Sequence, residues 1–449
     1  MKTYQDFLKE KERGNIIEFL KTAINEYRDT PAYRNALDAD EYEAGRNVTI
    51  TEYTKKLYTE TGKEVPDITS SNNRIASNFF HRLTTQRCAY SLGNGVTFAD
   101  DASGVKKKLG NDFDTVLYDT GHYALIHRVA YMFWNLDHAD YFKMTEFCPL
   151  YDEYNGGLMA GIRFWSIDWQ KKPVTVVLYE EDGYTKYRTK QGSTGMDIAE
   201  YEPKRAYKQN IAHNEVDPDE IISESNYSAL PIVPFWGNRH HQSDLINMRS
   251  KIDAYDLVKS GFANDLMDCA EIYWIVGNAM GMENVDLRKF RDRIKLQHIA
   301  VVDEDHSSVT PYTQDIPVNA RESLLKSLRE QIYEDYGALD VHTVAAGDTN
   351  DHVEAAYQPM DEEADAFEYE AIKCIRGILN IIGVDAVPMF SRNRISNQKE
   401  RTEMVMLAAS VLDDETIIKH LDWVTPDEYD GIINNKLQES DDRFSGDAE

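Results

Sequence analysis

The chain has few cysteines and no long apolar run, and each shortage excludes a class of protein. Its four cysteines lie far apart with no Cys-x-x-Cys pair, which argues against a disulfide framework and indicates a reducing compartment. They are Cys88, Cys148, Cys269 and Cys374. No run approaches the roughly 18 apolar residues of a membrane span, and Met1–Leu20 lacks the apolar core of a signal peptide. We therefore expect a soluble, intracellular protein with no membrane partner.

The sequence also lacks the local signatures of catalysis and of cofactor binding. No Gly-x-x-x-x-Gly-Lys-Ser/Thr segment occurs, which excludes a P-loop ATPase motor in this chain. Gly93-x-Gly95 lacks the third glycine of a dinucleotide site, so we interpret it as a turn. His122 and His127 have the wrong spacing for two ligands on one helix face. With no Ser-His-Asp or Cys-His signature either, we expect a structural protein that is not an enzyme and holds no cofactor.

Positive charge is scarce, because 78 Asp and Glu stand against 49 Lys and Arg, for a formal net charge of −29. Nonspecific binding to nucleic acid depends on Lys and Arg that displace the counterions of phosphate. The balance argues against DNA as a tight ligand but permits DNA as a neighbour. With 449 residues, of which 42% are apolar, the chain can form two or three domains around a sizeable core.

The first half of the chain mixes helices and strands. Ser70–Asn73 offers N-caps for a helix whose apolar residues recur at helical spacing as far as Leu92. From Ile126 to Arg188 the runs become rich in β-formers, and Glu180–Gly183 is a strong hairpin signal. A segment punctuated by prolines, Pro231–Trp236, closes this region.

Long helices dominate the second half. Gln242–Asp268 predicts a helix of 27 residues, about 40 Å long. A short insert of strands and one basic helix follows, and a second helix begins after Pro317. A third long helix follows the loop around Gly347, and residues 396–449 predict a small helical region with an acidic tail. The expected fold class is α+β, mainly helical.

The segment with the most one-sided charge is Asp340–Glu370, which has ten acidic residues and no Lys or Arg. A run of like charge usually marks a solvated or disordered tail, but here it is interleaved with a loop of small residues and with helical apolar spacing. We interpret it as a surface that faces a polyanion without binding it. The candidate residues for that surface are Glu354, Asp361, Glu362 and Asp365.

These carboxylates also allow an alternative from another functional class. Asp361, Glu362, Glu363 and Asp365 could hold two metal ions, as a nuclease or another phosphate-processing enzyme requires. Dense acidic clusters at a helix start more often complement the helix dipole and face solvent. Asp348, Asn350 and Asp351 invite a calcium interpretation, but the Asp-x-Asp-x-Asp-Gly start and the distal Glu of an EF-hand are absent. We therefore predict no metal site.

One short stretch has the opposite charge. Leu287, Phe290 and Ile294 lie on one face of a predicted helix, and basic residues occupy the rest. The basic residues are Arg288, Lys289, Arg291, Arg293 and Lys295. This face is either simply solvated or a contact surface for an acidic protein or for DNA phosphates.

Taken in order, these segments resemble the portal proteins of tailed bacteriophages, the head-to-tail connectors of long-tailed phages with double-stranded DNA. The matching segments are Asn73–Phe79, Tyr90–Phe98, Pro231–Phe235 before a long helix, Ile316–Pro317, the Gly347–Asp348 loop, and Ser391–Asn393 through Val424. Gly95 departs from the family's Y-x-L-G-x-P-V segment, in which proline is common at that position. The order of the segments, which cover nearly the whole chain, carries the resemblance.

The resemblance implies a division of the chain into the parts of a portal subunit. These are a wing (residues 1–240), a first stem helix (241–269), a mixed α/β clip (270–317), a second stem helix (318–338), a tunnel loop (339–357), a long helix at the junction of wing and crown (358–395), and crown helices with an acidic tail (396–449). The tunnel loop would centre on Val344, Ala345, Ala346, Gly347, Asp348, Thr349, Asn350 and Asp351.

The resemblance also implies partners and a location. Portal subunits close into a dodecameric ring, and double-stranded DNA passes through its channel during packaging and ejection. The expected protein partners are the terminase large subunit, a head-completion or tail adaptor protein, the scaffold and the major capsid protein. The expected location is the capsid vertex of the virion, with a stage in the host cytoplasm during assembly.

Overall fold

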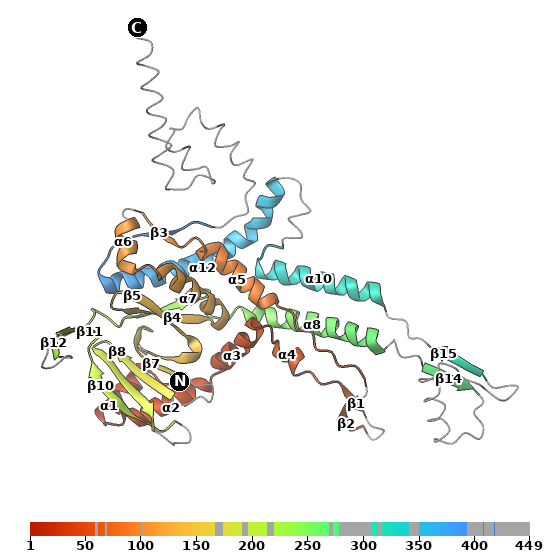
Figure 1. Cartoon of the computed structure of the whole chain (residues 1–449), viewed down its shortest axis with the longest axis horizontal. Coiled ribbons are helices and arrows are strands. Elements are labelled where there is room, and N and C mark those ends of the chain that lie inside the picture. Colours follow the sequence, from red (N-terminus) through yellow and green to blue (C-terminus); the bar gives the residue numbers. More distant parts are fainter. Residues whose placement is uncertain are drawn as a thin grey trace, which may run out of the picture. The chain divides into compact units, whose positions relative to one another are not determined.

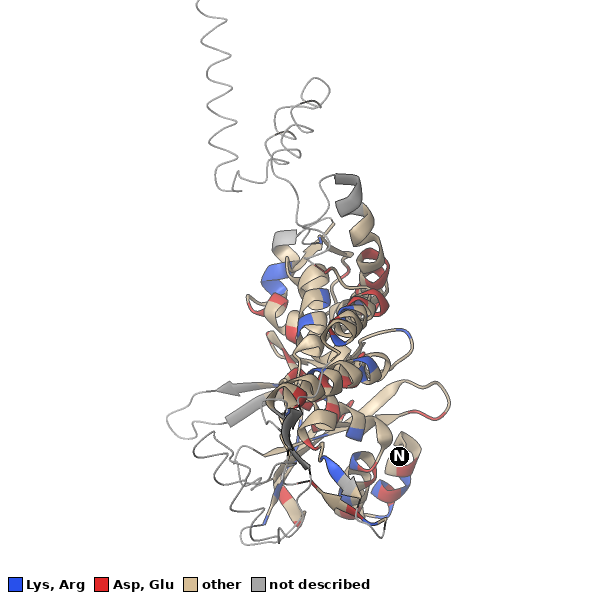
Figure 2. Ribbon diagram, turned by 90° about the vertical axis from the view of Figure 1, so that its right-hand side faces the viewer, with Lys and Arg blue, Asp and Glu red and all other residues tan. Residues whose placement is uncertain are grey.

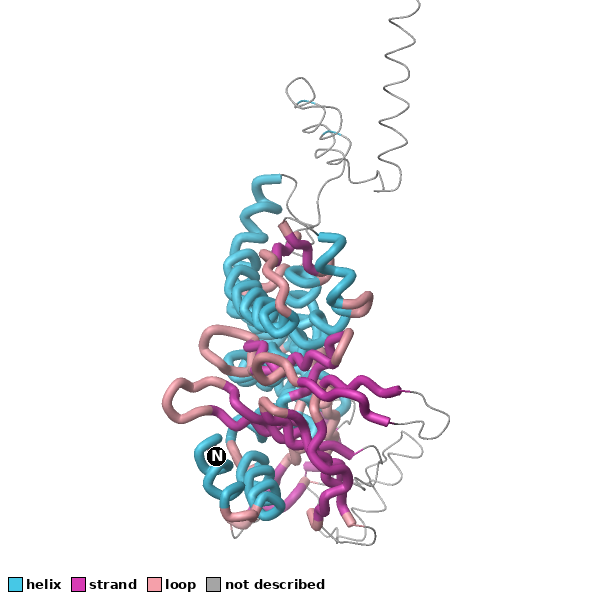
Figure 3. The backbone as a smooth tube through the Cα atoms, turned by 90° about the vertical axis from the view of Figure 1, so that its left-hand side faces the viewer, coloured by secondary structure: helices cyan, strands magenta, loops and turns pink. Residues whose placement is uncertain are grey.

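The computed structural model describes residues 1–58, 62–67, 70–99, 102–166, 174–190, 196–212, 220–268, 273–277, 308–312, 317–340 and 350–392, with single positions at 407 and 417. The chain divides into two compact units, Met1–Arg392 and Asn393–Glu449. Nearly all of the second unit, and with it the predicted crown helices and tail, lies outside the described residues. The first unit combines helices with antiparallel strands (Figures 1 and 3), which confirms the expected α+β class.

The chain opens with the helices α1 (Tyr4–Glu12), α2 (Ile16–Arg28) and α3 (Pro31–Glu43). Their starts follow from local chemistry. Thr3 and Asp6 form a capping box at α1, and Thr30 caps α3 just before a proline at its first position. Tyr27 is buried on α2 and donates a hydrogen bond to the carbonyl oxygen of Met144 at 3.0 Å, which ties these helices to the strands behind them.

Two antiparallel sheets provide most of the core of the first unit. The larger has the strand order β10-β9-β8-β7-β6, formed by β6 (Phe147–Tyr151), β7 (Leu158–Ser166), β8 (Val174–Glu180), β9 (Gly183–Thr189) and β10 (Ile198–Arg205). The smaller has the order β13-β4-β5, formed by β4 (Val129–Asn135), β5 (His138–Lys143) and β13 (Ile232–Trp236). The predicted hairpin at 180–183 is confirmed, since Glu180 pairs with Gly183 across the β8–β9 turn. Buried aromatic rings fill the space between the sheets, with Phe142 stacked on Phe147 at 5.7 Å.

Three helices pack closely on one another. They are α5 (Phe79–Leu92), α7 (Phe113–His127) and α12 (Asn350–Ile382). Two of them, α7 and α12, cover the smaller sheet. A Cβ atom at Gly121 of α7 would lie 2.7 Å from Leu92 and 3.0 Å from Phe367, so only glycine permits this approach of α7 to the other two helices. Phe367 of α12 also stacks on Phe235 of β13.

Two further long helices, α8 (Leu245–Asp268) and α10 (Val318–Tyr336), lie side by side (Figure 1). Both ranges were expected to be helical, and the two helices lie within the residues assigned to the two stem helices. The insert between them contains β14 (Tyr273–Gly277) paired antiparallel with β15 (Ser308–Tyr312). The basic helix predicted at 287–295 lies outside the described residues.

Two helix starts differ from the sequence expectation. Residues 70–78 do not form the first turns of a helix, and α5 begins only at Phe79, because the backbone of this segment is held by side chains of α8. At the other site α12 begins at Asn350, well before the expected boundary at 358, and it ends at Ile382. Pro359 lies inside this helix, where its missing N–H would normally favour a helix start.

Short elements complete the described part. Besides the helices α4 (Val48–Thr51) and α6 (Ala102–Leu109) and the 3₁₀ turn Met144–Glu146, they are strand pairs: β1 (Lys56–Tyr58) with β2 (Glu64–Pro66), β11 (Lys208–Ala212) with β12 (Glu220–Ser225), and β16 (Pro388–Phe390) with β3 (Val96–Phe98). The last pair joins the chain just after α12 to the chain just after α5. Within the residues that the structure describes, no helix is long and apolar enough to cross a membrane.

Candidate functional site

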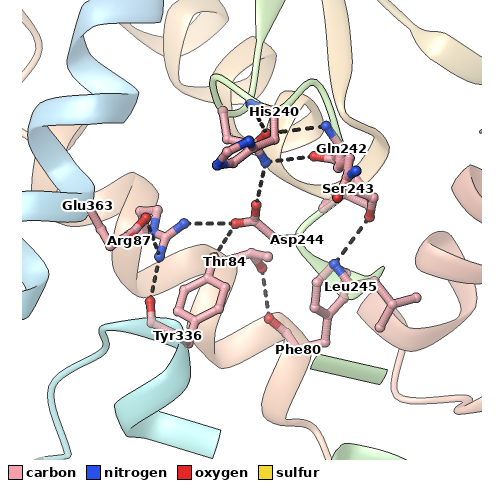
Figure 4. A network of polar contacts seen from close by, with 12 residues as sticks. Phe80, Thr84, Arg87, His240, Gln242, Ser243, Asp244, Leu245, Tyr336 and Glu363 are labelled. Carbon is pink, nitrogen blue, oxygen red and sulfur yellow. Dashed lines mark hydrogen bonds and ion pairs between the residues drawn. The ribbon is translucent and has the colours of Figure 1, made fainter. Parts of the chain in front are cut away.

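A buried polar junction joins four helices at the inner ends of α8 and α10 (Figure 4). Arg87 of α5 donates to Asp244 Oδ2 at 3.0 Å and to the carbonyl oxygen of Tyr336 at 2.5 Å. The Tyr336 hydroxyl donates to the same carboxylate oxygen at 2.8 Å, and Asn238 donates to the other one at 3.0 Å. Glu363 of α12 completes the site, 3.3 Å from the guanidinium. The start of α8, the end of α10, α5 and α12 therefore meet at one cation.

Burial and the neighbouring acidic groups together determine which side chains of this junction are charged. Burial works to lower the pKa of Arg87, but the surrounding acidic groups outweigh it and raise the pKa, so the guanidinium stays charged. Burial raises the pKa of Tyr336 well above its usual value, so the phenol keeps its proton and donates a hydrogen bond to Asp244. The guanidinium also lies 4.0 Å above the Tyr336 ring. A buried charge with this many partners fixes the directions in which the four helices leave the site.

A second cation controls the acidic face of α12, along which acidic residues recur (Figure 2). Arg392, just after β16, lies 2.9 Å from Asp361 Oδ1 and 2.9 Å from Glu368 Oε1, and it also pairs with Asp365. Tyr90 donates to Asp361 at 2.6 Å. Hydrogen bonding to Glu368 is the main reason why the pKa of Arg392 is raised. Two of the four residues expected to face a polyanion thus share an arginine.

The other two candidates of that surface differ from these. Glu362 is exposed and accepts a hydrogen bond from Gln358 at 3.4 Å, and no ion pair to it occurs within the described part of the chain. Glu354 belongs to α12, and its side chain lies outside what is described.

The remaining candidate residues fall largely outside the described ranges. Asn350 and Asp351, expected in a loop, form the first turn of α12. The residues outside are Val344, Ala345, Ala346, Gly347, Asp348 and Thr349 of the loop, and Arg288, Lys289, Arg291, Arg293 and Lys295 of the basic helix. Their proposed roles therefore remain predictions.

The metal-dependent alternative gains no support from the geometry. Among the described residues, no group of three or more His, Cys, Asp or Glu is placed to hold a metal ion. The carboxylates of Asp361 and Asp365 instead form ion pairs with Arg392, whose guanidinium supplies the positive charge that a metal ion would supply.

Sequence reasoning missed a polar stripe on α8 that holds the segment before α5. Asp256, Ser260 and Asn264 are all buried although they lie in the middle of a helix. The backbone N–H groups donate in order: Asn73 to Asn264 at 2.6 Å, Ile75 to Ser260 at 2.9 Å, and Ser77 to Asp256 at 2.9 Å. The three donors are two residues apart in an extended chain, which advances about 6.7 Å over that distance. The three acceptors are four residues apart in a helix, which advances about 6 Å, so each donor lies opposite an acceptor. The spacing of the three polar residues was the available signal.

A model of the phage portal protein family of the SPP1 Gp6-like kind matches residues 33–442. The chain belongs to the phage portal protein family. Among curated relatives, the portal protein of Clostridium phage phiCD119 is 29% identical over 216 residues, which are 46% of this chain and 48% of that protein. The portal protein of Bacillus phage SPP1 is 23% identical over 332 residues, 70% of this chain and 63% of that protein. The match thus spans from about half to somewhat less than two thirds of these relatives' lengths.

Two solved structures also align with this portal family member. One is the neck of an empty GTA particle with C6 symmetry, with a TM-score of 0.41, 10% identity, and coverage of 77% of this chain and 90% of that chain. The other is the neck of a native GTA particle with C12 symmetry, with a TM-score of 0.41, 8% identity, and coverage of 84% of this chain and 98% of that chain.

Proposed function

We propose that copies of this chain close into a dodecameric ring at a capsid vertex, whose channel passes double-stranded DNA during packaging and ejection. The observation that carries the proposal is the family match over residues 33–442. The chain acts without catalysis: its contribution is ring geometry and a channel wall to which DNA does not adhere.

The uncovered helix pair supports a ring. Val318 and Leu324, near the start of α10, are 39% and 47% exposed. On α8, Leu266 is 53% exposed. Two helices alone cannot cover both sides of their apolar surface, whereas neighbouring copies in a head-to-tail ring would cover it.

The acidic segment supports a wall that does not bind phosphate. Between Asn350 and Glu370 α12 contains no Lys or Arg, and Arg392 neutralises part of this charge from outside the helix. The exposed carboxylate of Glu362 stays available to repel phosphate within the screening length of about 10 Å. The loop from Val344 to Thr349 would then be the element that touches DNA.

The order of the segments supports the proposed partners. The stem pair α8 and α10 would carry the clip at 270–317, where Arg288, Lys289, Arg291, Arg293 and Lys295 would bind an acidic face of the tail adaptor protein. The terminase large subunit, the scaffold and the major capsid protein would contact other parts of the ring. The protein would assemble in the host cytoplasm and remain in the virion.

Native mass spectrometry of the purified chain, with negative-stain imaging, tests the proposal. We expect closed rings of about a dozen copies with a central hole. A chain that remains monomeric or dimeric, even when it is co-expressed with the scaffold of its phage, would contradict it.

A further inference from the structure

The tip of the β4–β5 hairpin has a backbone conformation that its residue disfavours. Leu136 is the first of two residues in the turn between Asn135 and His138, and its φ is +59°. A two-residue turn with positive φ at this position normally holds glycine, and leucine there costs roughly 1–2 kcal/mol. The Leu136 side chain is nevertheless 57% exposed, so burial does not repay the strain. Such strain concentrates at functional sites.

The rest of the fold holds this strained residue in place. The Leu136 N–H donates to the hydroxyl of Tyr227 at 3.0 Å. Tyr227 itself is buried, and its ring packs at a tilt against the Tyr207 ring, with 5.8 Å between the centroids. A buried tyrosine therefore holds the Leu136 backbone, while the Leu136 side chain faces solvent.

Leu136 separates two adjoining hollows that form one groove. Both hollows are lined by Trp134, Leu136 and Tyr227. The first, of about 320 Å³, is aromatic and includes Trp165 and Tyr184. The second, of about 270 Å³, is aliphatic where the end of α12 contributes Ile381 and Ile382. Volumes of this size accept one or two apolar side chains of a bound segment.

Two lysines at the second hollow lack carboxylate partners. Lys108 of α6 and Lys208 of β11 both line it and are exposed. Neither makes an ion pair with any residue that the structure describes, whereas the neighbouring Lys106 pairs with Asp114 at 2.8 Å. Lys208 instead lies 4.2 Å from the centre of the Tyr227 ring. In a chain of net charge −29, two lysines beside an apolar groove give it a local positive charge.

We propose that this groove docks a short acidic segment of a partner protein, with an apolar side chain seated against Leu136 and carboxylates on Lys108 and Lys208. The exposed Leu136 would contact the apolar side chain, which the aromatic lining of the groove would surround. Lys108 and Lys208 would pair with the carboxylates of the segment. The residues that line the groove lie outside the segments assigned to the clip and the loop, so the proposal does not rest on ring formation.

An acidic peptide suits the groove better than nucleic acid does. Asp137, next to Leu136, is almost fully exposed, and its side chain would repel a continuous phosphate backbone. A peptide can place its few carboxylates on the two lysines alone, whereas each nucleotide adds a phosphate in a strongly acidic surrounding.

The test uses the full chain and four labelled probes in a fluorescence anisotropy titration. The first probe is a short peptide of Asp and Glu around a central Leu-Phe pair. The second replaces that pair by serine, the third replaces the acids by lysine, and the fourth is a single-stranded oligonucleotide of equal charge. We expect the first probe to bind about tenfold or more tightly than the second, since burying one leucine side chain is worth about that much. It should also bind more tightly than the third probe, which has no carboxylates for Lys108 and Lys208, and than the fourth, which has no apolar side chain for the groove.

Variants locate the binding. Leu136→Gly relieves the backbone strain, so the fold should be at least as stable, yet binding of the first probe should fall about tenfold. Lys108→Glu combined with Lys208→Glu should weaken it similarly. Lys107→Glu, an exposed lysine of α6 that does not line the groove, is the matched control and should bind like the unaltered chain. Equal binding of the oligonucleotide, no binding of the acidic peptide, or binding that survives Leu136→Gly would each overturn the proposal.

Discussion

At the scale of the residue, Arg87 determines how the helix pair joins the body of the subunit. Arg87→Met should lower the free energy of unfolding by about 3–5 kcal/mol, because Asp244 and the carbonyl of Tyr336 would remain buried without their cation. Urea unfolding followed by circular dichroism measures the change. Arg376→Met, at an exposed arginine of α12, is the control and should change stability by less than about 0.5 kcal/mol. Equal midpoints for the two variants would show that the junction is not a stability element.

The buried thiols give a second prediction at this scale. Burial raises the pKa of Cys88, Cys148 and Cys374, so the reactive thiolate is scarce even in mildly alkaline solution. A Cys269→Ser chain should therefore show no reactive thiol toward Ellman's reagent at pH 8 or pH 9, and three after unfolding in urea. Rapid reaction in the folded state, increasing from pH 8 to pH 9, would mean that a thiol is exposed with an ordinary pKa.

The residues that matter most at this scale could not be found from sequence patterns. Arg87 and Asp244 are 157 positions apart, and Arg392 lies 24 to 31 positions beyond its carboxylates. Hydrophobic periodicity reports which face of a helix is buried but not which helices meet. The acidity of residues 340–370 was visible in the sequence, whereas its partial neutralisation by Arg392 required the β16–β3 pairing that brings the chain back to α12.

At the scale of the element, α8 acts as a template for the extended chain at residues 70–78. Ser260→Val should leave the partly buried N–H of Ile75 without its side-chain acceptor, at a cost of about 1 kcal/mol. Hydrogen exchange at the Ile75 amide should then accelerate, while the amides inside α5 keep their protection. Ser250→Val, at an exposed serine of the same helix, is the matched control. Unchanged exchange at Ile75 in the Ser260 variant would rule out the template role.

The elements also show where local sequence signals fail. The ranges of the long helices α8 and α10 were predicted from apolar residues at helical spacing. The division implied by the resemblance placed a helix from 358, whereas α12 begins at Asn350 and continues through Pro359. Buried Tyr357 and Met360, on either side of the proline, pack with Tyr90 and Leu339, and this tertiary contact keeps the helix continuous back to Asn350.

At the scale of the whole molecule, Arg87 and Arg392 hold the chain on either side of the loop that we propose to contact DNA. Arg87 fixes the end of α10 before the loop, and Arg392 fixes the acidic part of α12 after it. The described contacts of both sites come from residues outside the loop Val344–Thr349. Its length should therefore affect function without affecting assembly.

Removing Val344–Thr349 tests this separation, because it spares α12 from its first residue. We expect rings of unchanged size by native mass spectrometry and an unchanged melting temperature, since neither arginine site is altered. Packaging of DNA into heads built with the shortened chain should fall sharply, because the element proposed to touch DNA is gone. Replacing the same residues by an equally long Gly-Ser segment is the control that distinguishes loop length from loop sequence. Full packaging by the shortened chain would remove the loop from the mechanism while leaving the ring intact.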